Sequence, residues 1–77
     1  LHSAAVDQLQ KAVSIDESIA KNANAPSSPV YRFHLGMALK AKGDKDAARR
    51  ELETALRLGE KVPFKESDEA RKALSTM

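Results

Sequence analysis

The chain has 77 residues, of which 42% are hydrophobic and 31% charged, enough for one small domain with a thin core and too apolar for a disordered chain. It contains no cysteine, which excludes disulfides and thiolate metal sites, and no apolar run reaches the length of a membrane-spanning helix, so we expect no direct insertion into a membrane. The net charge of +2 does not indicate a nucleic-acid partner, because acidic residues are interleaved with the basic ones and only one Tyr and two Phe are present.

The first predicted helix runs from Ala4 to about Ala23. Apolar side chains recur along it at spacings of three and four residues and mark one broad stripe, formed by Ala5, Leu9, Ala12, Val13, Ile15, Ile19, Ala20 and Ala23. The chain begins with Leu1 rather than methionine, and we expect it to be a fragment of a longer protein. The compartment of that protein does not follow from this sequence.

The segment NANAPSS, residues 22–28, interrupts this pattern with two Asn, one Pro and two Ser. Ser28 followed by Pro29 is a helix start signal, since the Ser oxygen caps the helix and Pro at its first position needs no N–H partner. A second helix then extends to about Lys42, and Gly43 is predicted to end it in the left-handed conformation.

Asp44 is predicted as the N-cap of a third helix that ends at Gly59. The short Gly43–Asp44 link forces the second and third helices to pack antiparallel as a hairpin. Gly36 lies inside the second helix, where glycine costs about 1 kcal/mol relative to alanine. We interpret it as a point of close helix approach, together with Ala38, Ala48 and Ala55. Pro63 interrupts the chain again, and a short fourth helix is predicted from about Glu66 to Ser75, with Phe64 ahead of it as an anchor.

Residues 29–62 resemble a tetratricopeptide repeat, a 34-residue helix-turn-helix unit. When Pro29 is taken as the first position, the signature positions of that family are filled by Leu35, Gly36, Ala38, Leu39, Gly43, Asp44, Ala48, Leu52, Ala55, Leu56 and Leu58. Two positions depart from the family pattern. Arg32 stands where the family usually has Trp or another large apolar residue, and Glu60 stands where it usually has Pro.

The resemblance implies an all-α, antiparallel array of about one and a half repeats plus a capping helix. Residues 1–24 resemble the second helix of a preceding repeat, extended by SIDESIAKN, because Ala5, Leu9 and Ala12 repeat the spacing of Ala48, Leu52 and Ala55. Residues 25–28 form the linker, residues 29–62 the repeat, and residues 63–77 resemble the solvating helix that closes such arrays.

A looser resemblance covers VYRFHLGMALKAKGDKDAARRELETAL, a following Phe, and EARKAL. These segments are similar to the C-terminal end of tetratricopeptide lipoproteins that accompany bacterial exopolysaccharide and PEP-CTERM protein-sorting systems. This similarity implies a bacterial, envelope-associated parent protein.

The sequence offers no constellation for catalysis. His2 and His34 are the only histidines, and the positions three and four residues after His34 hold Met37 and Ala38, which do not complete a metal site. No phosphate-binding loop, nucleophile elbow or HExxH pattern occurs. We therefore expect a non-enzyme without cofactor or metal.

The resemblance implies a concave binding face on the second helix, with His34 beside it, formed by Val30, Phe33, Met37, Lys40 and Ala41. A Phe and a Met one turn apart suit an apolar or helical peptide. In the alternative interpretation, the first helix or a neighbouring repeat covers Phe33 and Met37. The first function hypothesis is a protein–protein interaction scaffold that binds a peptide or helix of another protein. The second is a structural self-association module whose groove is filled by its own or a partner chain's helix.

The oligomeric state is predicted from the size of the array. About three repeats are usually needed for independent stability, and this chain has about half that number. The stripe of Leu9, Val13, Ile15 and Ile19 is also wide for a helix packed on one side. We therefore expect a two-fold symmetric homodimer in which the first helices pack together or exchange between chains.

Overall fold

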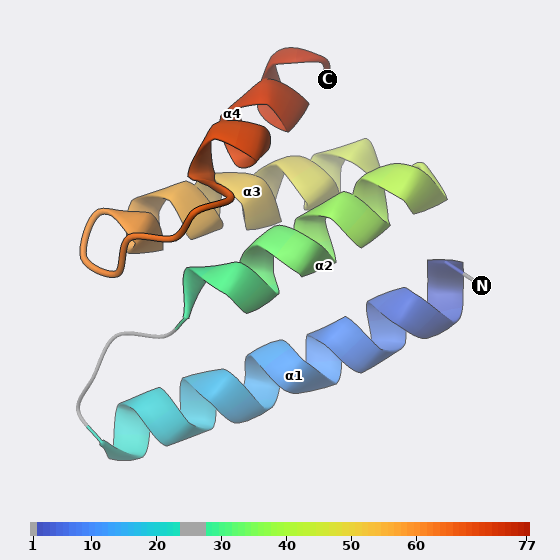
Figure 1. Ribbon diagram of the computed structural model, residues 1–77. Helices are drawn as coiled ribbons and strands as arrows, with labels where there is room; N and C mark the ends of the chain where they lie inside the picture. The colour runs from blue at the N-terminus through green and yellow to red at the C-terminus, as the bar shows by residue number, and fades with distance from the viewer. Residues whose placement is uncertain (1, 24–27) are drawn as a thin grey trace.

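The computed structural model describes residues 2–23 and 28–77 of the chain. Within these ranges the chain forms four α-helices and no strand, which confirms the predicted all-α class. The helices are α1 (His2–Asn22), α2 (Pro29–Lys42), α3 (Lys45–Gly59) and α4 (Ser67–Ser75) (Figure 1). Residues 24–27, which include three of the four residues of the predicted linker 25–28, lie outside the described residues.

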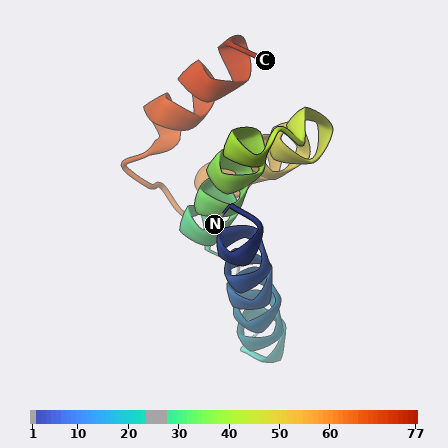
Figure 2. The same ribbon diagram turned by 90° about the vertical axis from the view of Figure 1, so that its right-hand side faces the viewer.

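The helices follow one another in space as they do along the chain. The main contacts between helices join α1 to α2, α2 to α3, and α3 to α4. The α2–α3 hairpin therefore occupies the middle of the molecule, with α1 along one edge and α4 on the opposite side (Figures 1 and 2). The described part of α1 thus has one helical neighbour, α2, along most of its length.

Both ends of α2 have the predicted caps. The Ser28 hydroxyl accepts a hydrogen bond from the Val30 N–H at 3.3 Å, and Pro29 occupies the first turn. At the other end Gly43 has a φ of 99°, and its N–H donates to the carbonyl oxygens of Leu39 and Lys40, each at 3.1 Å. The Asp44 carboxylate then caps α3 by accepting from the Ala47 N–H at 3.4 Å.

Gly36 is a point of close approach between α2 and α3, as predicted. A Cβ atom added there would lie 2.7 Å from Leu52 Cγ, 2.9 Å from Leu52 Cδ2 and 3.3 Å from the Ala48 carbonyl oxygen. Leu52 and Ala48 are both completely buried. A glycine is therefore required because the third helix occupies the space that a methyl group would need.

Two clusters of buried side chains form the core, one on each side of the hairpin. The cluster between α1 and the hairpin consists of Val6, Val13, Leu35, Leu39 and Ala48. The cluster between the hairpin and α4 consists of Phe33, Leu52, Ala55, Ala70 and Ala73. Each outer helix is thus fixed by a separate set of apolar contacts.

The face of α1 that enters the core differs from the predicted stripe. Val6 is 3% exposed and was not part of the prediction, whereas Ile15 and Ile19 are 61% and 62% exposed. Ala5 is also exposed, while Ala48, to which it was matched, is completely buried. Successive residues of a helix are rotated by about 100°, so the face carrying Val6 and Val13 points toward α2 and the face carrying Ala5 does not.

Arg32 joins three helices at the position where the resemblance implies a large apolar residue. Its guanidinium donates to both carboxylate oxygens of Glu51 on α3, at 2.9 and 3.2 Å, and to Glu17 on α1. Nearby, the Ser28 N–H donates to the Asp16 carboxylate at 2.7 Å. These polar contacts, in addition to the apolar cluster, fix α1 against the hairpin.

Candidate protein-binding surfaces

The residues predicted to line a groove on α2 differ widely in accessibility. His34 and Ala41 are exposed, Val30, Met37 and Lys40 are half-buried, and Phe33 is buried. The six residues therefore do not form one open face. The contacts of the individual residues show which of them remain available to a partner.

Phe33 is a core residue rather than an exposed groove residue. It is 3% exposed and packs in the cluster that contains Ala70 and Ala73 of α4. Its ring centroid also lies 6.2 Å from that of Phe64, in the segment before α4. Phe33 is therefore covered, as in the alternative interpretation, but by α4 and not by the first helix or a neighbouring repeat. The sequence signal for this cover is Phe64 followed by two alanines at helical spacing.

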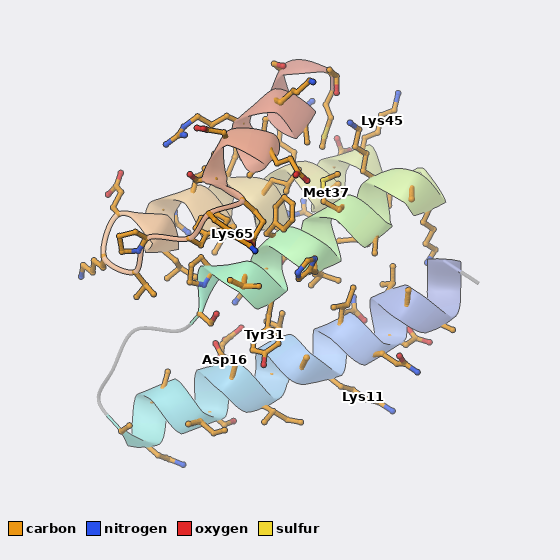
Figure 3. The ribbon with its side chains drawn as sticks, in the orientation of Figure 1. Lys11, Asp16, Tyr31, Met37, Lys45 and Lys65 are labelled. Carbon is orange, nitrogen blue, oxygen red and sulfur yellow. The ribbon has the colours of Figure 1, made fainter. Side chains whose placement is uncertain are left out.

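Met37 and Lys40 line a shallow pocket between α2 and α4, which we call the α2–α4 groove. It has a volume of about 190 Å³ and is lined by Met37, Lys40, Glu69, Lys72, Ala73 and Thr76. Met37 projects from α2 on the side of α4 (Figure 3). The Lys40 ammonium group donates a hydrogen bond to the Thr76 hydroxyl at 2.8 Å, across the groove. The predicted groove is thus reduced to a small pocket in which the ammonium group of Lys40 already has a hydrogen-bond partner.

His34 is exposed, and its ring contacts that of Phe33. The two ring centroids lie 5.2 Å apart in an edge-to-face arrangement. Among residues 2–23 and 28–77, no group of three or more His, Cys, Asp or Glu side chains is placed to hold a metal ion. The geometry around His34 therefore indicates a surface residue.

The most exposed large apolar side chains lie elsewhere, on α1 and at the start of α2. Ile15 and Ile19 project from α1, and Tyr31 on α2, which is 42% exposed, lies beside them. Together with Ala12 and Asp16 they line a pocket of about 240 Å³. Figure 3 shows Tyr31 reaching from α2 to α1 next to Asp16. We call Ala12, Ile15, Ile19 and Tyr31 the α1 surface.

The α1 surface was not among the predicted site residues. The sequence prediction placed Ile15 and Ile19 in a stripe that is wide for a helix packed on one side, and from that width it expected a contact between the first helices of two chains. It assigned Tyr31 no role. The sequence does show that α1 has two apolar faces. Because α2 covers only one of them, the other is available as a surface.

No protein-family model matches this chain, and the comparisons with curated proteins and with solved structures give no significant match either. None of the helices formed by the described residues combines the length and apolar character needed to cross a membrane.

Proposed function

We propose that this protein is a non-catalytic protein–protein interaction module that binds an α-helix or a peptide on an exposed apolar surface. The α1 surface carries this proposal. Single apolar side chains on a protein surface need no explanation, but contiguous apolar patches indicate interaction sites. Ile15, Ile19 and Tyr31 come from two helices and meet around one pocket, so they form a patch rather than scattered residues.

We further propose that the chain is part of a tetratricopeptide-like array from a bacterial, envelope-associated protein. Three features support the helix-turn-helix unit: the capped α2, the left-handed Gly43 and the contact of Gly36 with Leu52. The bacterial, envelope-associated parent rests on the sequence resemblance alone. In such an array, α1 belongs to an incomplete unit and has an uncovered side.

The α2–α4 groove is the second surface on which a peptide could bind. Its volume is about 190 Å³, which is smaller than the 240 Å³ of the pocket lined by Ile15, Ile19 and Tyr31. Its floor is apolar, formed by Met37 and Ala73, but the Lys40–Thr76 hydrogen bond spans it. We therefore assign the principal interaction to the α1 surface.

A displayed library of helical peptides tests the function. We expect enrichment of peptides that carry apolar residues at spacings of three and four, the pattern of a helix bound in a groove. The double variant Ile15→Ser, Ile19→Ser should lose these peptides while keeping its helical circular dichroism.

The matched control is Met37→Ser, which alters the α2–α4 groove instead. It should retain the enriched peptides. Loss of binding in the Met37 variant alone would move the site to the α2–α4 groove. Failure of the protein to enrich any peptide over a selection without the protein, at a dilution where its chains are separate, would contradict the proposed function.

A further inference from the structure

Helix α1 has two apolar faces, and only one of them is covered. The covered face contains Val6, Val13 and Ala20, which are buried. The second face is rotated from it by about one residue, or 100°. It carries no charged residue along the whole described length of the helix and consists of Ala4, Ala5, Gln8, Ala12, Ile15, Ile19, Asn22 and Ala23. All of these residues are exposed except Ala12, which is half-buried.

The side chains of this second face change in size along the helix. Its N-terminal half presents three alanines, at positions 4, 5 and 12, with Gln8 between them. Its C-terminal half presents the two large side chains, Ile15 and Ile19. A helix of the same sequence laid antiparallel can therefore place Ile15 of each copy against an alanine of the other copy. At this position the face is complementary to itself.

We propose that the partner of the α1 surface is α1 of a second copy of this chain, packed antiparallel about a two-fold axis. The proposal rests on the proposed function, since it names the helix that the α1 surface binds. Ile15 of each copy lies against Ala12 of the other, and Ile19 lies near Gln8. In this register, residues 12 and 15, 8 and 19, and 5 and 22 are opposite one another.

The charges beside the face agree with this register. Lys11 and Ser18 lie on one edge of the face, and antiparallel packing places Lys11 of one copy near Ser18 of the other. On the other edge, the two Asp16 carboxylates are separated by roughly five residues along the axis, or about 7 Å. Asp16 also accepts the Ser28 N–H in its own chain. No like charges are brought into direct contact.

A dimer interface of standard size would need the whole length of this face. A standard interface buries about 800 Å² per partner. This is roughly one sixth of the 5118 Å² of accessible surface on this chain. The two isoleucines alone do not supply that area. Pairing along the full 21-residue length of α1, about 30 Å, with Tyr31 at the edge, is therefore part of the proposal.

Light scattering at micromolar concentration gives the first test. We expect a mass twice the 8.4 kDa of one chain. The double variant Ile15→Ser, Ile19→Ser should raise the dimer dissociation constant by roughly 100-fold, as truncation of two interface anchors does. The control Gln10→Ala, Ser14→Ala alters two exposed positions with the same spacing on another face of α1 and should leave the constant unchanged.

Cross-linking tests the geometry, because the chain has no cysteine of its own. An equal mixture of the Ala5→Cys and Asn22→Cys proteins should form covalent dimers with a short bismaleimide cross-linker, which spans the two edges of the face on which these residues lie. Ala5→Cys alone should not, since the two equivalent residues lie about 25 Å apart along antiparallel helices. Cross-linking of Ala5→Cys with itself would show parallel packing and overturn the proposal.

A wild-type protein that stays monomeric would also overturn this inference. The proposed function would survive that result if the monomer still enriched peptides through Ile15 and Ile19. In that case the uncovered face of α1 binds a helix of a different protein or of a preceding unit. A monomer that enriched no peptide would contradict both proposals.

Discussion

Arg32 and Gly36 lie one turn apart on α2 and differ in how they meet α3. The long side chain of Arg32 bridges to the neighbouring helices, whereas the missing side chain of Gly36 lets α3 come close. Arg32 lies where α1, α2 and α3 meet, and its guanidinium spans the gap by bonding to Glu17 and Glu51. An apolar side chain at this position would leave the Glu51 carboxylate, which is 19% exposed, without its partner. The departure from the family pattern at position 32 is therefore accompanied by acidic residues on both neighbouring helices.

Gly36 allows a direct prediction at the same scale. Gly36→Ala should gain about 1 kcal/mol of helix propensity. It should lose roughly 1–3 kcal/mol from overpacking, because the added methyl group would lie 2.7 Å from Cγ of Leu52, a fully buried side chain. We expect a net decrease in the melting temperature Tm, of several degrees for each 1 kcal/mol in a domain of this size.

The comparison of Arg49→Gly with Arg49→Ala supplies the control for Gly36. Arg49 is exposed on α3, so these two changes report helix propensity without packing. If Gly36→Ala raised Tm by the difference between the two Arg49 variants, the close approach of α2 and α3 would have no energetic effect. Thermal unfolding followed by circular dichroism decides this.

At the scale of one element, the end of α2 depends on backbone conformation alone. Gly43 has a φ of 99°, and apart from its two chain neighbours no residue has a heavy atom within 4 Å of a Cβ added there. Gly43→Ala should therefore lower the free energy of unfolding by about 1–2 kcal/mol, the cost of a left-handed alanine. Gly43→Asn should lower it less, because Asn tolerates this conformation better.

Urea unfolding of both Gly43 variants is the measurement. The order of stability should be wild type, then Asn, then Ala. Equal effects of Ala and Asn would mean that φ is not the cause. Since no atom beyond the adjoining residues lies near an added Cβ, a clash with another part of the molecule is excluded in advance.

The boundaries of α2 were predictable because their signals are local. Ser28, Pro29 and Gly43 act on the backbone within a few residues, whatever the rest of the chain does. The buried face of α1 was not predictable in the same way. Both of its faces contain apolar residues, and the choice between Val6 and Ala5 is made by the packing of α2.

The position of Phe33 shows the same limit for a residue of the candidate site. The repeat pattern placed Phe33 on an exposed face of α2. Whether that face stays open depends on where α4 docks, which is set by contacts with Ala70 and Ala73 more than thirty residues away. Periodicity within one helix contains no information about that contact.

At the scale of the whole molecule, stability comes from two thin clusters on opposite sides of one hairpin. Phe33→Ala should cost about 3–5 kcal/mol, as is usual for a buried Phe. The entire stability of a chain of this length is roughly 4–12 kcal/mol. We therefore expect this variant to lose much of its helical circular dichroism at 37 °C.

Ile15→Ala is the matched control for Phe33→Ala. Both variants are measured in dilute solution, where the chains are separate and Ile15 makes no contact with a second copy. Ile15 is 61% exposed, so this change should alter the free energy of unfolding by less than about 0.5 kcal/mol. If Phe33→Ala were equally harmless, α4 would not be held on the hairpin by Phe33. Urea titration of both variants gives the answer.

The succession of contacts along the chain has a kinetic consequence. Each helix packs mainly on the next one, so most tertiary contacts close short segments of chain. Proteins with such low contact order fold in microseconds to milliseconds, because little loop entropy is lost before contacts form. A hairpin of α2 and α3 can therefore form as soon as both segments have left the ribosome. α4 then docks on a surface that already exists, and a unit added at either end requires no rearrangement of the others.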